Sequence, residues 1–216
     1  MNYQYQEAYK EIGKKGQALL EAKTVTLVGI GGVGSAVAEM LARSGVNLRL
    51  VDKDRVFEED LQRLSLFQEE DVTKFKAKEA KKILEKITKK PKIKVFHEEL
   101  TRHNTFLLDA EIVVDCTNDL ATSVIINKHA RKSLLVCFYA GDSGLIFHRN
   151  KKLNSEKLRK EIEKLKTVKE VGIINPTVHM AAAIVVSEVL KLLLKKKPTA
   201  GLIQINSWMN TVKVKK

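Results

Sequence analysis

Four glycines follow an apolar stretch near the start of the chain and form the pattern G-x-G-G-x-G: Gly29, Gly31, Gly32 and Gly34. The apolar stretch, residues 25–30, is typical of a buried strand, and the residues after the glycines favour a helix. A turn this sharp requires residues without a Cβ, and it lets the backbone approach a phosphate closely. The helix directs its free N–H groups and the positive end of its dipole to the same point. The pattern therefore predicts a nucleotide-binding turn.

A carboxylate lies where the next expected strand ends. Asp52 follows residues 46–51 and stands 18 residues beyond Gly34. In a nucleotide-binding sheet, an acid in this place accepts hydrogen bonds from the ribose hydroxyls. The alternative is a loop carboxylate that caps a turn, and we favour the ribose role because of the glycine turn before it. Up to this point, an NAD-dependent oxidoreductase explains the residues equally well.

Expected strands and helices alternate along the first two thirds of the chain. The strands are expected at residues 25–30, 46–51, 93–96, 112–114 and 134–138, and the helices at residues 5–22, 36–44, 77–87 and 121–131. This alternation predicts an α/β fold with a Rossmann-like, mostly parallel sheet and helices on both faces.

The pattern changes after Gly141. A strand at residues 145–147, a charged helix at 154–166 and a closing hairpin at 202–205 and 211–214 predict a C-terminal antiparallel extension. Asn175 and Pro176 indicate the start of a long apolar helix, with Asn as its cap and Pro as its first residue. Trp208 in the hairpin is expected to anchor the core, with a dimer contact as the alternative.

The chain of 216 residues is long enough for one sizeable core. We expect a single domain, with an N-terminal helix at residues 1–22, a nucleotide-binding core at 23–140, and an extension facing substrate and dimer partner at 141–216. The chain shows no signal-peptide pattern, and its longest apolar run, residues 180–186, is too short to cross a bilayer. Two cysteines indicate neither a disulfide framework nor a zinc set. A cytoplasmic protein without a membrane partner is the simplest interpretation.

Lysine dominates a formal charge of +13 at pH 7. The 31 lysines far outnumber the 8 arginines, and they alternate with glutamates along the expected helices. Few aromatic residues lie among them, so nucleic-acid bases would find no stacking platform. We therefore expect solvated lysine and glutamate faces rather than a nucleic-acid partner.

Residues 51–76 distinguish between the classes of nucleotide-binding protein. They read VDKDRVFEEDLQRLSLFQEEDVTKFK, with a D-x-D-x-V head, then L-Q-R, then a lysine 13 residues after the arginine. This pattern resembles the ThiF/MoeB/HesA superfamily, which is related to ubiquitin-activating enzymes. The likeness continues in GQALLEAKTVTLVGIGGVG, VVDCTND, VCFYAGDSGLIF and GIINPTVHMAAAIVVSEVLKLLL, so it covers nearly the whole chain. The resemblance implies ATP-dependent adenylation of a carboxylate with release of pyrophosphate.

The resemblance places two cations against the ATP phosphates. Arg63 has the planar fork that grips a phosphate, and Lys76 supplies a point charge. Because charge moves onto the leaving phosphates, fixed cations and Mg²⁺ supply most of the catalysis. The alternatives are a surface ion pair of Arg63 with Asp60 or Glu59, and an ordinary surface position for Lys76. The residues expected to bind the nucleotide are Gly29, Gly31, Gly32, Gly34, Asp52, Asp54, Asp60, Arg63, Lys76 and Asn118.

A metal ligand is expected in the turn VVDCTND, which leaves a strand at the carboxyl edge of the sheet. The family has the order Asp-Asn there, whereas this chain has Asn118-Asp119. We expect Asp119 to hold Mg²⁺ and to act in catalysis. The alternatives are an N-cap role for Asp119 and weak ligation by Asn118. Cys116 in the same turn is interpreted as a small buried apolar residue rather than a nucleophile.

Four departures from the family pattern shape the expected chemistry. Asp60 stands where the family usually has Asn. The family often reaches across a dimer with an N-terminal arginine, but no arginine precedes Arg43, and the candidate substitutes are Lys10, Lys14 and Lys15. The paired C-x-x-C motifs of bacterial members are missing, which predicts no zinc. Residues 149–171, where the family's thiol lies, contain no cysteine, so we expect a partner's thiol or sulfide to collect the acyl-adenylate.

Two classes of carboxylate substrate remain open. One is the C-terminal glycine of a ubiquitin-like sulfur-carrier protein. The other is a small-molecule carboxylate such as guanylylpyridinol, which a short, zinc-free methanogen branch of the family adenylates. A basic segment either steers an acidic partner or forms a solvated helix; it comprises Arg149, Lys151, Lys152, Lys157, Arg159 and Lys160. The resemblance also implies a homodimer.

Two other classes of function stay open. An NAD-dependent oxidoreductase would leave Arg63 and Lys76 without a role, and the sequence presents no Tyr-Lys or His-Asp catalytic arrangement. A non-catalytic nucleotide-binding relative would account for Asp60, for the order Asn118-Asp119 and for the missing N-terminal arginine.

Overall fold

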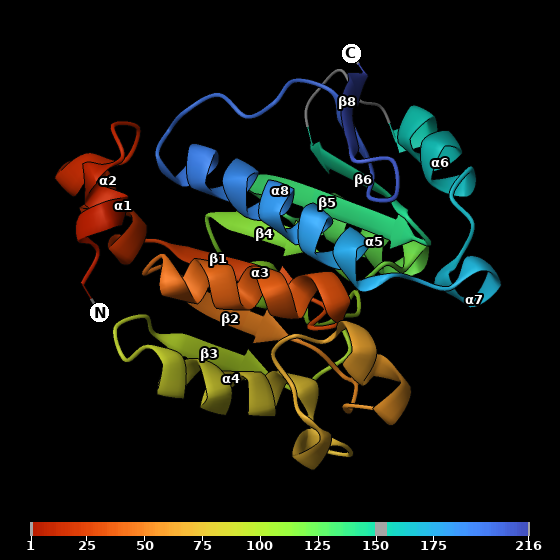
Figure 1. Cartoon of the computed structure of the whole chain (residues 1–216), viewed down its shortest axis with the longest axis horizontal. Helices are drawn as coiled ribbons and strands as arrows, with labels where there is room; N and C mark the ends of the chain where they lie inside the picture. The colour runs from red at the N-terminus through yellow and green to blue at the C-terminus, as the bar shows by residue number, and fades with distance from the viewer. Residues whose placement is uncertain (1, 150–154, 216) are drawn as a thin grey trace.

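The computed structural model describes residues 2–149 and 155–215, and its central feature is one eight-stranded sheet (Figure 1). The strand order is β3-β2-β1-β4-β5-β6-β7-β8. The first five strands in this order are parallel, and the last three are antiparallel to their neighbours. The expected fold class is therefore confirmed. The strands are β1 (Thr24–Val28), β2 (Asn47–Val51), β3 (Ile93–Phe96), β4 (Ile112–Asp115), β5 (Ser133–Ala140), β6 (Ser143–His148), β7 (Leu202–Asn206) and β8 (Thr211–Lys215).

Helices cover both faces of the sheet. One face packs against α3 (Gly32–Arg43), α4 (Lys76–Ile87) and α8 (Asn175–Leu193), and the three helices lie across the sheet in Figure 1. The other face packs against α5 (Leu120–His129), the short 3₁₀ helix η3 (Thr105–Leu108) and α6 (Ser155–Glu163). Strands with apolar residues pointing to both faces, such as β4, read as continuous apolar runs because both faces are buried.

The long helix α8 is apolar because it lies inside the protein. By length and composition it would pass for a membrane-spanning helix, but half of its apolar window is buried. It packs on α3 and on β5, β6 and β7, with Ala181, Ala182 and Val185 fully buried. Small residues on this face let the helix approach the sheet closely. Pro176 lies in its first turn as expected, although Asn175 is the first helical residue and not the cap.

Two expectations about the ends of the chain are wrong. The N-terminal helix is broken into α1 (Gln4–Ala8) and α2 (Gly13–Ala22), and Gly13 takes a φ of +60° where the second helix begins. Trp208 does not anchor the core, because its exposed fraction is 78%. It lies in the four-residue turn between β7 and β8, and its neighbour Met209 is exposed as well. When an apolar residue lies in the turn of a hairpin, the sequence does not show whether its side chain points into the core.

Candidate nucleotide-binding site

A cavity of about 990 Å³ opens at the carboxyl ends of the parallel strands. In Figure 1 the arrows of these strands run toward the side on which α7 (Val168–Val171) lies. Open α/β sheets bind ligands at this edge. Ten of the sequence-predicted site residues line the cavity: Gly29, Gly31, Gly32, Asp52, Asp54, Asp60, Arg63, Lys76, Asn118 and Asp119. Gly34 is buried beneath them and supports the turn instead.

The glycine turn has the geometry that its sequence predicts. Gly29 has a φ of +86°, and a Cβ there would lie 2.9 Å from the carbonyl of Cys116. Gly34 packs directly on the backbone of Gly29, which brings the first turn of α3 against β1. Gly31 faces open space, since the nearest atom to a Cβ would be the Tyr139 hydroxyl at 4.0 Å. The unbonded N–H groups at the start of α3 therefore meet the cavity without a side chain in the way.

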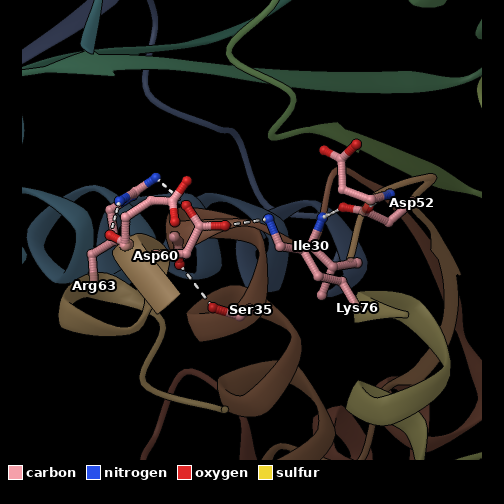
Figure 2. A network of polar contacts seen from close by, with 9 residues as sticks. Ile30, Ser35, Asp52, Asp60, Arg63 and Lys76 are labelled. Carbon is pink, nitrogen blue, oxygen red and sulfur yellow. Dashed lines mark hydrogen bonds and ion pairs between the residues drawn. The ribbon is translucent and has the colours of Figure 1, made fainter. Parts of the chain in front are cut away.

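Asp52 ties the end of β2 to the glycine turn. Its Oδ2 accepts a hydrogen bond from the Ile30 N–H at 2.5 Å, and its Oδ1 accepts one from the Asp54 N–H at 2.7 Å (Figure 2). Burial raises the pKa of Asp52, although these two hydrogen bonds and nearby Lys76 partly oppose the rise. The turn-capping alternative is thus present in the structure. A carboxylate has about four lone-pair sites, so two remain for the predicted ribose contact.

Arg63 and Lys76 meet at one carboxylate. Arg63 is the last residue of η1 (Glu58–Arg63), and Lys76 is the first residue of α4. The Asp60 Oδ1 lies 2.5 Å from the Arg63 Nη2, and its Oδ2 lies 2.8 Å from the Lys76 Nζ. Figure 2 shows Arg63 beside Asp60 in this network. The exposed fractions of the three side chains are 21% for Arg63, 8% for Lys76 and 11% for Asp60.

The structure places both of these cations on the wall of the cavity. Lys76 is buried against the cavity, so it does not occupy an ordinary surface position. Arg63 does pair with Asp60, and its Nη1 also donates to the Glu59 carbonyl at 3.1 Å. This ion pair lies on the cavity wall rather than on the open surface. Both cations are therefore positioned for an anionic ligand that also contacts the glycine turn.

The turn after β4 forms the opposite wall. Asn118, at a φ of +55°, uses both ends of its amide on Tyr139. Its Nδ2 donates to the Tyr139 carbonyl at 3.0 Å, and its Oδ1 accepts from the Tyr139 N–H at 3.0 Å. The amide thus joins the turn to β5. Because both ends of the amide are already hydrogen-bonded, Asn118 is a weaker candidate for a metal ligand than Asp119.

Asp119 caps α5 while remaining exposed on the cavity wall. It accepts a hydrogen bond from the Thr122 N–H at 2.8 Å. Its partial burial disfavours the charge, but hydrogen bonds from Thr122 and from the Ala121 backbone outweigh that effect and lower its pKa. The carboxylate is therefore ionised at neutral pH. The N-cap alternative is observed, and it leaves the predicted metal role open because one carboxylate serves both purposes.

Sequence reasoning missed two parts of the cavity wall. Tyr139 is buried at the end of β5, and its hydroxyl would lie 3.5 Å from a Cβ on Gly32. The other part is residues 167–169 at the start of α7, which close the side of the cavity facing β5. Tyr139 could have been noticed because it ends an apolar strand at the ligand-binding edge. Residues 167–169 carry no comparable pattern.

Backbone hydrogen bonds join this second part of the wall to β5. The Gly141 N–H donates to the Gly172 carbonyl at 2.9 Å, and the Ile174 N–H donates to the Gly141 carbonyl at 3.3 Å. The Thr177 hydroxyl donates to the same carbonyl at 2.9 Å. Gly141 and Gly172 both have positive φ values, 58° and 71°, which other residues rarely adopt. The joint between α7, α8 and β5 therefore depends on both glycines.

A Rossmann-like sheet that presents a glycine turn, two convergent cations and an ionised carboxylate at its ligand-binding edge defines a nucleotide-binding protein suited to phosphoryl chemistry. The ThiF family model matches residues 3–216, so the chain belongs to the ThiF family.

Known relatives agree with this assignment. The sulfur carrier protein ThiS adenylyltransferase of Bacillus subtilis (strain 168) is 32% identical over 96% of this chain and 65% of its own length. The sulfur carrier protein adenylyltransferase of Thermus thermophilus is 31% identical over 59% of this chain and 48% of its own length. The chain thus spans less than two thirds of the length of these curated relatives.

Solved structures share the fold. Escherichia coli MccB, crystallised with ATP, has a TM-score of 0.76 at 22% identity, with 93% of this chain and 65% of that chain covered. A structure of PaaA has a TM-score of 0.75 at 20% identity, with the same shares covered. At this level of identity, the likeness concerns the arrangement of helices and strands.

Proposed function

We propose that this chain is an adenylyltransferase that uses ATP to activate a carboxylate as an acyl-adenylate and releases pyrophosphate. The observation that carries the proposal is the convergence of Arg63 and Lys76 on one cavity with the glycine turn. Hydride transfer does not itself require cations, whereas displacement of pyrophosphate places charge where two cations can stabilise it. The names of the relatives, which include sulfur carrier protein adenylyltransferases, support the same reaction class.

The residues of the chain suit the bond changes of this reaction. A carboxylate oxygen of the substrate attacks the α-phosphorus of ATP, and the bond from that phosphorus to the bridging oxygen breaks. Pyrophosphate leaves with the electron pair, so negative charge grows on the leaving group. The guanidinium of Arg63 and the ammonium of Lys76 are placed to stabilise that charge, and the N–H groups of the first turn of α3 to bind a phosphate oxygen.

A magnesium ion fits the donors of the cavity. Mg²⁺ is commonly bound by one or two carboxylates together with substrate phosphates, rather than by a protein cage. In the part of the chain that the structure describes, no group of three or more His, Cys, Asp or Glu side chains could hold a metal. Asp119 is an ionised, accessible carboxylate on the wall and would hold the ion together with the nucleotide. When bound, the ion would neutralise part of the phosphate charge.

The two cysteines are unsuited to take over the acyl group. Cys116 and Cys137 are buried, and burial raises the pKa of both thiols. A buried neutral thiol is a poor nucleophile. The proposal therefore assigns the next step to an external thiol or sulfide, carried by a partner.

The carboxylate itself is one of two kinds. The C-terminal glycine of a sulfur-carrier protein is favoured by the name of the Bacillus relative. A small-molecule carboxylate such as guanylylpyridinol is the alternative, which the lack of a cysteine in residues 149–171 suggests. Of the basic segment that would steer an acidic partner, Lys151 and Lys152 lie outside the described residues. The guanidinium of Arg149 donates hydrogen bonds to three backbone carbonyls, so its role is structural.

We further propose a homodimer. Trp208 and Met209 in the β7–β8 turn, and Val212 and Val214 on β8, are exposed. A contiguous exposed apolar surface is typical of a protein contact. Light scattering coupled to size exclusion would measure the mass in solution, and a monomer at all concentrations would contradict this part of the proposal.

The decisive experiment is substrate-dependent exchange of radiolabelled pyrophosphate into ATP. A carrier protein ending in Gly-Gly and guanylylpyridinol are supplied in separate reactions. Exchange that requires one of them identifies the substrate, because the label enters ATP only when an acyl-adenylate forms reversibly. Binding of NAD that is tighter than binding of ATP, with no exchange on either carboxylate, would contradict the proposed reaction.

A further inference from the structure

Asp60 occupies an unusual position between the two cations of the site. Each of its carboxylate oxygens takes one cation, at 2.5 Å from the Arg63 Nη2 and 2.8 Å from the Lys76 Nζ. Its side chain is only 11% exposed, and it lines the same cavity as the glycine turn. In hydrogen-bond terms it does what a phosphate would do there, since it offers two anionic oxygens to a guanidinium and an ammonium.

The contacts of the cations show how completely Asp60 engages them. Within residues 2–149 and 155–215, the only ion pair of Lys76 is with Asp60. Arg63 divides its donors between Asp60 and the Glu59 carbonyl. A triphosphate that approaches these cations must therefore displace the carboxylate or lie beside it. In either case, a negative charge already present opposes a negative charge that arrives.

The charges of the cavity wall taken together do not offset this effect. Six carboxylate side chains line the cavity against four cationic ones. One of the four, Lys53, is already paired with Glu99 at 2.7 Å. Metal-free triphosphate would thus enter a cavity of net negative charge, whereas a triphosphate that carries Mg²⁺ has part of its charge neutralised beforehand.

We propose that Asp60 is an internal anion that competes with the nucleotide phosphates for Arg63 and Lys76, and that it restricts tight binding to the magnesium complex of the nucleotide. This rests on the proposed function only in taking a nucleoside triphosphate as the ligand. The competing explanation is that Asp60 merely clamps η1 to α4. The two explanations differ in sign, because loss of a competitor strengthens nucleotide binding and loss of a clamp weakens it.

Titration calorimetry on the full chain tests the inference with ATP as the probe, once with MgCl₂ and once with EDTA. Asp60→Asn keeps the shape of the side chain and removes its charge. We expect it to bind ATP at least tenfold more tightly in EDTA, which corresponds to about 1.4 kcal/mol. The gain should be smaller in MgCl₂. Asp60→Ala should shift affinity in the same direction, and thermal unfolding checks that both variants fold.

The matched control is Glu58→Gln. Glu58 lies in the same 3₁₀ helix, is exposed, and does not line the cavity, so the same change of charge should leave the dissociation constant of ATP within twofold of the wild type. Equal or weaker binding of ATP by Asp60→Asn in EDTA would overturn the inference and leave Asp60 as a clamp. ATP binding and pyrophosphate exchange are separate measurements. If Asp60→Asn changes the affinity for ATP but the protein shows no pyrophosphate exchange, only the proposed reaction is contradicted.

Discussion

The two walls of the cavity differ in whether their charged side chains are paired within the protein. On the wall built from β2, η1 and α4, the charged side chains of Asp52, Asp60, Arg63 and Lys76 already have partners inside the protein. On the wall built from the turn after β4, Asp119 stays exposed and ionised. The difference indicates a division of labour, with preorganised cations on one side and an accessible ligand for a cation on the other.

The largest expected effect comes from removing the preorganised cations. Arg63→Ala and Lys76→Ala should each lower pyrophosphate exchange by at least two orders of magnitude, the scale seen when a donor to developing charge is lost. The measurement is the exchange rate at saturating ATP. Lys78→Ala, two residues along the same helix and outside the cavity, serves as the control. Unchanged exchange in both variants would remove the cation wall from the mechanism.

A smaller effect is expected on the opposite wall. Asp119→Asn retains a good N-cap for α5 but loses the charge, so the exchange rate should fall roughly tenfold and the Mg²⁺ concentration for half-maximal exchange should rise. Asp119→Ala loses the cap as well, and the free energy of unfolding should then fall by about 1 kcal/mol. If Asp119→Asn leaves the exchange rate and its Mg²⁺ requirement unchanged while Asp119→Ala lowers the exchange rate, Asp119 is a cap and not a metal ligand.

The cysteines should show no effect on the activating step. Cys116→Ala and Cys137→Ala remove thiols that burial keeps neutral, so pyrophosphate exchange per folded molecule should stay within about twofold of the wild type. Mass spectrometry of the wild type after a turnover with substrate provides the second readout. A thioester adduct on either cysteine would contradict the assignment of acyl capture to a partner.

The last prediction concerns pH, because the pKa values of the carboxylates on the two walls are shifted in opposite directions. Burial raises the pKa of Asp52, whereas hydrogen bonds lower that of Asp119 despite its partial burial. As pH falls from neutral, Asp52 should therefore take up its proton first, which carbon-detected NMR titration would resolve.

The sign of the stability change follows from linkage. The ionised form of Asp52 is disfavoured in the folded state, so its unfavourable contribution is relieved as pH falls through its raised pKa. Asp119 contributes stability above its unfolded pKa and loses it as pH falls through its lowered pKa. Comparison of the unfolding free energies of the wild type and Asp119→Asn should show a difference that vanishes at the acid end. A difference independent of pH would show that Asp119 is not titrating.

Much of the fold and part of the site were accessible from the sequence. The glycine turn is local, so its spacing alone predicts the approach of α3 to β1 at Gly29 and Gly34. Alternation of apolar runs and amphipathic helices predicts the parallel sheet, because each β-α unit is a local pattern. The family-like spacing singled out Arg63 and Lys76, and both residues line the cavity, while their contact with a nucleotide stays a prediction.

The remainder depends on contacts between distant segments, which spacing does not encode. The bridging of Arg63 and Lys76 by Asp60 requires η1 and the start of α4 to fold onto each other. Asn118 looked available as a ligand, yet its amide is consumed by Tyr139, 21 residues further along. Trp208 was misjudged for a similar reason, since the sequence of a hairpin turn does not show which other segments pack against it.

The hydrogen bonds at Gly141 give the cavity a mechanical property. They fasten the segment that closes one side of the site to the end of β5 and, through Thr177, to the first turn of the long core helix. These bonds all meet at Gly141, so the position of the segment depends on the end of β5 and on the first turn of α8. A variant that loosens the packing of α8 should therefore change the cavity wall at residues 167–169 as well as the hydrophobic core.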